Sequence, residues 1–153
     1  MKNTYIIWGL VVIALLVGGA WWSNSLSSGD SGGSENPIIA RDGLHWHSDL
    51  AIVINGEQQD IPANIGLIGG HNPIHTHEND GEVHMEFEGV VRENDTRLGI
   101  LFNHWGREFT ANRIFDYVNG EGGSVRMLVN GVENTDFENY RMHDGDKIEI
   151  RYE

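Results

Sequence analysis

The sequence contains no cysteine. That absence excludes disulfide bonds, thiolate metal sites and thiol catalysis, so any metal site must rest on His, carboxylate or Met ligands. Proline is also scarce, with three in 153 residues, and the last of them is Pro73. Basic residues are few: ten Lys and Arg compare with 23 Asp and Glu, for a formal net charge of −13. This acidity argues against nucleic acid as a partner, because phosphate binding requires the opposite sign.

One long apolar run is present, at residues 6–22. Its seventeen residues carry no charge, which is the short end of the length that spans a bilayer. Lys2 precedes the run and no basic residue follows until Arg41, so the positive-inside rule places the N-terminus in the cytoplasm. We therefore expect a signal-anchor over residues 1–22 and an extracytoplasmic domain. A cleaved signal peptide is the alternative, because residues 18–20 (Gly-Gly-Ala) suit a peptidase, and the domain would then be secreted.

Two further segments follow the apolar run. Residues 23–37 are rich in Ser and Gly and lack apolar periodicity, which predicts a flexible linker. Residues 38–153 are long enough to bury a core and form one predicted domain. This domain contains all eight histidines, and its 9 basic and 21 acidic residues give a net charge of −12. Such a domain attracts cations.

The densest group of possible metal ligands lies within residues 71–88, HNPIHTHENDGEVHMEFE. Residues 78–81 (Glu-Asn-Asp-Gly) are typical of a hairpin loop. Closing the loop predicts two opposed pairs, His75 with His84 and His77 with Glu82. Opposed side chains share a face of the sheet with Cβ atoms about 4.5–5.5 Å apart, and residues i and i+2 also share a face. Glu86 therefore joins this patch, and an apolar stripe forms on the reverse face from Val83, Met85 and Phe87.

A second HxH pair begins another predicted strand, over residues 45–55. Its apolar side chains alternate with polar ones, which puts both histidines of the pair on the polar face. If the two polar faces adjoin, five imidazoles meet, more than one ordinary ion requires. The predicted metal ligands are His75, His77, His84, His45, His47, Glu82 and Glu86.

Three imidazoles with one open position are typical of catalytic zinc, and the same nitrogen donors suit Cu(II). We therefore expect a copper or zinc ion. No nucleophile, oxyanion donor or substrate pocket is evident, so metal capture or delivery is favoured over catalysis. The alternatives are a His-ligated metalloenzyme, cupin-like or hydrolytic, and an interaction module whose histidines are structural or pH-responsive. The sequence identifies no protein partner.

The rest of the domain predicts one helix among short strands. The helix covers residues 97–105, with Thr96 as its N-cap, Gly106 at its end and an apolar stripe at i, i+3, i+4, i+7. His104 lies off this stripe and is interpreted as a boundary residue. Further strands are predicted at residues 57–61, 124–130 and 147–152, whereas 109–117 and 138–142 remain ambiguous.

The segment Asp144-Gly145-Asp146 is predicted to be a tight turn. It lacks the ligand series of an EF-hand loop, so calcium binding is not expected. His143, which precedes the turn, is interpreted as incidental. Strands packed on one amphipathic helix predict an α+β domain.

Residues 125–153, VRMLVNGVENTDFENYRMHDGDKIEIRYE, resemble the end of β-grasp, ubiquitin-like domains of the sulfur-carrier type. The resemblance implies a mixed β-grasp-like sheet with hairpins packed on one helix. Sulfur-carrier activity requires a Gly-Gly C-terminus, and this sequence reads Arg151-Tyr152-Glu153 instead. That activity is therefore not expected.

Residues 44–153 resemble a group of membrane-anchored extracytoplasmic His-rich domains of archaea and bacteria. The shared motifs are HxH, IPANIG, HTHxxxGxxHxE, a helix ending in WG, VRMLVNG and DGD. They occur here at residues 45–47, 61–66, 75–86, 105–106, 125–131 and 144–146. The resemblance implies extracytoplasmic localisation and a His-based metal site.

A third resemblance concerns the cupins, whose first motif is matched by Gly69-x5-His75-x-His77-x4-Glu82-x6-Gly89. The second cupin motif contains PxG, and no proline follows Pro73, so the second motif is absent. A cupin-like small β-barrel is the alternative fold.

Overall fold

The computed structural model describes residues 36–153. The predicted anchor over residues 1–22, and the predicted linker up to residue 35, lie outside the described residues. Within residues 36–153, no helix has the length and apolar character that crossing a membrane requires.

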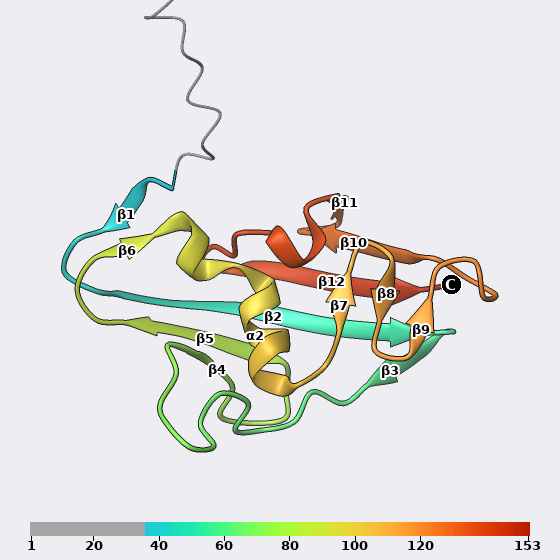
Figure 1. The fold of residues 1–153 in the computed structure, drawn as a ribbon, viewed down its shortest axis with the longest axis horizontal. Helices are drawn as coiled ribbons and strands as arrows, with labels where there is room; N and C mark the ends of the chain where they lie inside the picture. The colour runs from blue at the N-terminus through green and yellow to red at the C-terminus, as the bar shows by residue number, and fades with distance from the viewer. Residues whose placement is uncertain (1–35) are drawn as a thin grey trace, which may run out of the picture. The chain divides into compact units, whose positions relative to one another are not determined.

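A mixed sheet of seven strands forms the centre of the fold (Figure 1). Its order is β11-β10-β12-β2-β5-β4, with β3 also paired to β2. The longest strand, β2, pairs antiparallel with β5 through its first half and with β3 through its last residues, and β12 runs parallel along its other edge. The strands are β2 (Leu44–Ile54), β3 (Glu57–Gln59), β4 (Ile74–His75), β5 (Glu82–Phe87), β10 (Val125–Val129), β11 (Val132–Glu133) and β12 (Asp146–Tyr152).

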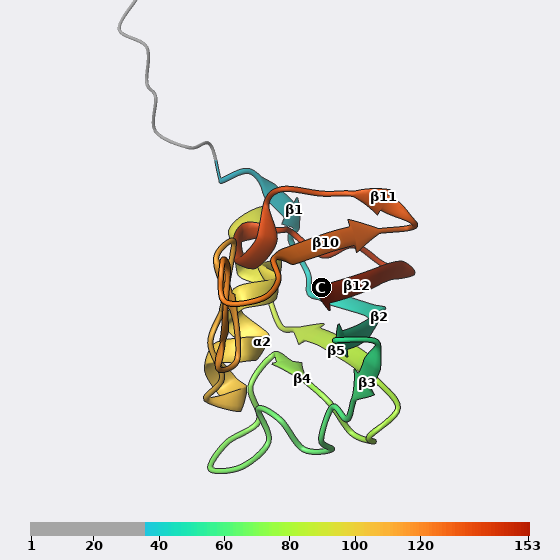
Figure 2. The ribbon, with the colours of Figure 1, turned by 90° about the vertical axis from the view of Figure 1, so that its right-hand side faces the viewer.

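The smaller elements lie around this sheet. One α-helix, α2 (Leu98–Trp105), and a small three-stranded sheet occupy the same side of it (Figure 2). The small sheet contains β7 (Phe109–Thr110), β8 (Arg113–Ile114) and β9 (Tyr117–Val118). The remaining elements are the pair β1 (Ile38–Ala40) and β6 (Val91–Arg92) and the 3-10 helices η1 (Glu93–Thr96) and η2 (Phe137–Asn139).

This architecture confirms the predicted α+β class. The seven-stranded sheet is open, because its end strands β11 and β4 do not pair with each other. The alternative of a closed cupin-like barrel is therefore wrong for the described part of the chain.

The core lies between the main sheet and α2. Even-numbered side chains of β2, such as Ile52 and Ile54, are buried, and odd-numbered ones face the other way, as the alternation predicts. Burying an aliphatic side chain of this kind contributes about 1.5–3 kcal/mol. The helix contributes its predicted apolar stripe to the same core, through Leu98, Leu101 and Phe102.

The predicted helix exists, but its N-cap was wrongly predicted. Thr96 lies in η1, where its hydroxyl donates a hydrogen bond to Glu93 O (3.0 Å), and Arg97 takes the N-cap position without a side-chain bond. Because η1 extends through Thr96, α2 begins only at Leu98 and its N-cap position falls on Arg97. Gly106 ends the helix in a left-handed conformation, as predicted.

Two ambiguous segments prove to be short elements. Residues 109–117 form β7, β8 and the first residue of β9, whereas η2 begins one residue before the segment 138–142. The predicted strand at 57–61 is shorter, ending at Gln59.

The turn before β12 is fixed by a buried carboxylate, that of Asp146. It accepts hydrogen bonds from Tyr140 OH (2.6 Å), His143 N (2.8 Å) and Asn130 Nδ2 (2.9 Å). Burial by itself raises the pKa of Asp146, but these three hydrogen bonds outweigh it and hold the pKa below its ordinary value of 3.8. Burial, followed by the bond to Asp146, raises the pKa of Tyr140. The prediction of a turn here is confirmed.

Candidate metal centre

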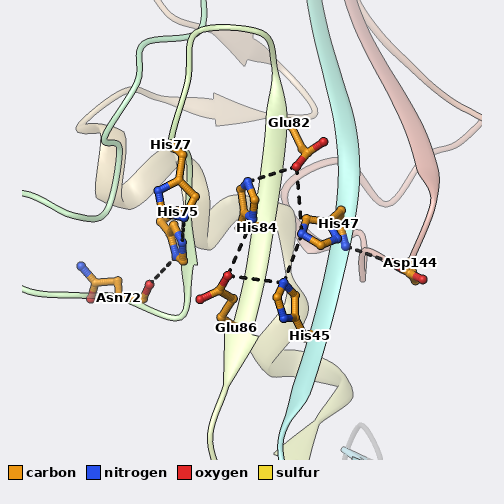
Figure 3. A network of polar contacts seen from close by, with 9 residues as sticks. All are labelled: His45, His47, Asn72, His75, His77, Glu82, His84, Glu86 and Asp144. Atoms are coloured by element: carbon orange, nitrogen blue, oxygen red, sulfur yellow. Dashed lines mark hydrogen bonds and ion pairs between the residues drawn. The ribbon is translucent and has the colours of Figure 1, made fainter.

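Three adjacent strands bring the predicted ligands together. The register of β2, β5 and β4 places His47 beside His84 and His84 beside His75, and it places His45 beside Glu86. Figure 3 shows these side chains on one face of the strands, with the histidines of β2 and β4 on either side of His84. The predicted opposition of His75 and His84 is confirmed. β4 ends at His75, so no ladder pair joins His77 to Glu82.

We define the inner cluster as the four residues whose ligand atoms lie within 4.8 Å of one another: His75, His77, His84 and Glu86. The Nε2 atoms of His75 and His77 are 3.2 Å apart. Two ligands of a tetrahedral zinc ion with Zn–N bonds of 2.0–2.1 Å lie about 3.3 Å apart. The HTH pair therefore has the spacing of two ligands, and the ligand atoms of His84 and Glu86 lie within 4.8 Å of it.

His75 is the buried member of the inner cluster, with no exposed surface. Its Nδ1 donates a hydrogen bond to Asn72 O (2.9 Å), which leaves the lone pair of the neutral ring on Nε2, the atom that faces His77 Nε2. Burial lowers the pKa of His75 below 6.5, even though the bond to Asn72 and the charge of Glu86 act in the opposite direction. The imidazole is therefore neutral at pH 7, the form that binds metal.

His84 lies between the other imidazoles. Its Nε2 is 3.1 Å from Glu82 Oε1, whereas its Nδ1 is buried and has no hydrogen-bond partner. Burial, then repulsion by His47 and His77, lowers the pKa of His84 below 6.5. A buried nitrogen without a partner costs stability, and coordination of an ion satisfies such an atom. Glu82 orients the ring, as carboxylates that accept a hydrogen bond from a metal-binding imidazole commonly do.

The HTH pair is held in place by the loop that contains the IPANIG motif. Thr76, between the two histidines, is fully buried. Its hydroxyl donates to Pro62 O (2.8 Å) and accepts from Ile65 N (3.1 Å), and its backbone pairs with Asn64 and Ile65. The loop thus fixes the backbone from which both imidazoles project.

Gly66 allows this loop to approach His75. A Cβ atom at Gly66 would lie 2.6 Å from Ile74 O and 3.2 Å from His75 Cβ, and its φ of +78° disfavours any other residue. We expect Gly66→Ala to lower the free energy of unfolding by about 2–3 kcal/mol, through overpacking and backbone strain together. Urea unfolding of the metal-free protein measures this loss.

Gly69 provides the matched control in the same loop. Its φ is +86°, but a Cβ atom there would meet nothing within 4 Å. Gly69→Ala should cost only the backbone strain, about 1 kcal/mol. Equal losses in the two variants would show that close packing against His75 does not matter.

We define the outer cluster as the three residues His45, His47 and His84, whose ligand atoms also lie within 4.8 Å of one another. The Nε2 atoms of His45 and His47 are 3.2 Å apart, and their side chains are 64% and 41% exposed. The backbone of His47 is fixed by the turn before β12: its N–H donates to Asp144 Oδ1 (3.0 Å), and its carbonyl accepts from Gly145 N (2.7 Å).

The three remaining histidines belong to neither cluster. His104 donates from Nδ1 to Ile74 O (3.1 Å), a structural bond at the boundary of the core. His143 packs against Trp46, and His71 contacts the His75 ring edge-on.

Three residues that hold the HTH pair in place were not predicted from the sequence. Asn72 and Thr76 set the orientation of the HTH pair, and Gly66 gives the loop room. The IPANIG motif was a signal for such a role, because a Gly-containing stretch before a ligand pair indicates close backbone approach. His75 is also more deeply buried than a residue on a polar face would be.

No family model, curated protein or solved structure matches the chain.

The donor atoms of the site determine what it can bind. Imidazole nitrogens and carboxylate oxygens are grouped so that they can hold a metal ion in the inner cluster, the outer cluster or both. A depression of about 890 Å³ adjoins the site and is lined by Asp42, His45, Glu86 and Glu88, among others. Its carboxylates and exposed rim suit hydrated cations better than an enclosed organic substrate.

Proposed function

We propose that this protein binds a copper or zinc ion through the inner cluster. The observation that carries the proposal is the HTH pair, whose Nε2 atoms lie 3.2 Å apart beside a buried, unpartnered His84 Nδ1. Each of these three imidazole nitrogens either carries a lone pair that can bind a metal ion or gains one when it loses its proton. The hydrogen bond from His75 to Asn72 and the contact of His84 with Glu82 supply the outer-shell support that metal-binding imidazoles normally have.

The donor set selects the class of ion. Three imidazoles and one carboxylate suit zinc and Cu(II), whereas the hard ions Mg²⁺ and Ca²⁺ require mainly oxygen ligands. Cu(I) favours thiolate and thioether ligands. Cysteine is absent, and Met85 is buried on the core face of β5 with no exposed surface.

We further propose that the domain is tethered outside the cytoplasmic membrane and captures or delivers its ion there. The charge-free run at residues 6–22 and the acidity of residues 38–153 support this. The resemblance to membrane-anchored His-rich domains agrees with it. The parallel pairing of β2 with β12, flanked by antiparallel neighbours and covered by α2, supports a β-grasp-like ancestry for the domain.

Titration of the full-length protein, purified without an affinity tag, tests the function. We expect at least one Zn²⁺ or Cu²⁺ per chain with a dissociation constant of about 1 µM or lower, equivalent to about 8 kcal/mol of binding free energy. A chromophoric chelator in competition gives the affinity, and a zinc/copper competition ranks the two ions. Absence of binding by both ions would leave an acidic interaction module, without metal, as the better description.

A further inference from the structure

The number of ligands exceeds what one ion needs. A tetrahedral ion takes four ligands, and the inner cluster already supplies four. Three more ligand side chains lie beside it: His45, His47 and Glu82. These groups project from β2 and β5 toward the same patch. They are therefore available to bind a metal ion in addition to the one in the inner cluster.

The outer pair repeats the geometry of the inner pair. In each HxH segment the two Nε2 atoms are 3.2 Å apart, the spacing of two ligands on one ion. The pairs come from different strands, β2 and the end of β4, and the ring of His84 contacts both. Its centroid is 4.6 Å from that of His47 and 4.5 Å from that of His77.

Two carboxylates connect the pairs. Glu86 Oε1 lies 3.4 Å from His45 Nε2 and 3.8 Å from His84 Nδ1. Glu82 Oε1 lies 3.1 Å from His84 Nε2 and 4.0 Å from His47 Nε2. Carboxylates in such positions offset the mutual repulsion of two cations, and they can bind one ion through each oxygen.

We propose that the patch holds two divalent cations at once. The inner ion is bound by the HTH pair and the unpartnered Nδ1 of His84, and the outer ion by His45 and His47, with the two carboxylates between them. This proposal rests on the proposed function, because it adds a second ion to the inner cluster. The outer ion is bound more weakly than the inner one and exchanges more rapidly. The side chains of His45 and His47 are 64% and 41% exposed, whereas His75 is buried.

The stoichiometry of Zn²⁺ binding tests this proposal on the full-length, untagged protein. Native mass spectrometry and equilibrium titration should give two ions for the wild type and one for the double variant His45→Ala/His47→Ala. The remaining ion of the variant should be the tighter one, with its dissociation constant changed less than about tenfold. The replaced side chains are exposed (His45) or half-buried (His47) and lie on the polar face of β2, so urea unfolding of the metal-free variant should be close to that of the wild type.

A second double variant, His71→Ala/His143→Ala, is the matched control. It removes two imidazoles that belong to neither cluster and should retain two ions. One ion in the wild type and an unchanged count in the outer-pair variant would overturn the second site and leave the proposed function intact. Two ions in the outer-pair variant, or one ion in the control variant, would place the second ion elsewhere and also overturn it. No ion in the wild type would overturn the proposed function itself.

Discussion

Replacement of His77 by Ala is expected to weaken Zn²⁺ binding to the inner cluster by more than about 100-fold. Loss of an outer-shell partner alone costs 10–100-fold in affinity, and loss of a ligand costs more. His77 is exposed, so its truncation leaves no cavity, and the free energy of unfolding without metal should change by less than about 0.5 kcal/mol. Competition titration measures the first quantity and urea unfolding the second.

His77 is the better target than His75, although both belong to the HTH pair. His75 is fully buried and bonded to Asn72, so its replacement by Ala would also destabilise the loop. A second readout is the stabilisation by zinc itself. At a free concentration of about 100 times Kd, zinc should raise the unfolding free energy of the wild type by about 2.7 kcal/mol, and His77→Ala should lose most of this gain.

His143→Ala provides the control for this prediction. The side chain is exposed and belongs to neither cluster. Its removal should leave zinc affinity unchanged within about twofold. A His77 variant that binds zinc as tightly as this control would show that the inner cluster is not the binding site.

Replacement of Asp146 by Ala is expected to lower the free energy of unfolding by about 4 kcal/mol. Three hydrogen bonds to a charged carboxylate are lost, from Tyr140, His143 and Asn130. Such a bond contributes about 1.5–3 kcal/mol, and the lower end applies here because Asn130 and His143 are exposed residues that can bond to water instead. The turn that fixes the backbone of His47 begins two residues earlier, at Asp144, so the outer cluster should lose order as well. Urea unfolding near neutral pH measures the stability loss.

The pH dependence distinguishes the charge of Asp146 from its shape. Its pKa in the folded protein is below 3.8, so its carboxylate contributes stability that is fully present above pH 3.8 and is lost as the pH falls through the lowered pKa. Asp146→Asn retains the size of the side chain and removes this contribution. The stability difference between wild type and Asp146→Asn should therefore be large near pH 7 and narrow toward about pH 3. An equal difference at both pH values would assign the effect to packing alone.

Much of the fold was predictable because the signals were local. The alternating apolar residues of β2 and β12 and the apolar stripe of α2 each depend on neighbours in the sequence. The N-cap of α2 was mispredicted because η1 extends through Thr96 and the helix begins one residue later than predicted, at Leu98. The parallel pairing of β2 with β12 has no local signal in the sequence.

The candidate site, too, has a part that local sequence signals predict and a part that depends on the tertiary fold. The pairing of His75 with His84 follows from the hairpin loop at 78–81, so it could be predicted. The approach of His45 and His47 to that hairpin depends on the order of strands in the sheet, and the sequence left it open. The role of Thr76 was hidden because a threonine between two histidines looks like an exposed residue until a loop covers it.

The central position of β2 has a consequence for how the protein is made. His47 is held by Asp144, 97 positions later in the chain, and residues 48–54 of β2 gain their neighbour on one edge only from β12. A nascent chain on the ribosome therefore carries all its imidazoles before it has the segment that aligns them. Contacts of such long range slow folding, so the outer cluster should become ordered only after β12 has been synthesised.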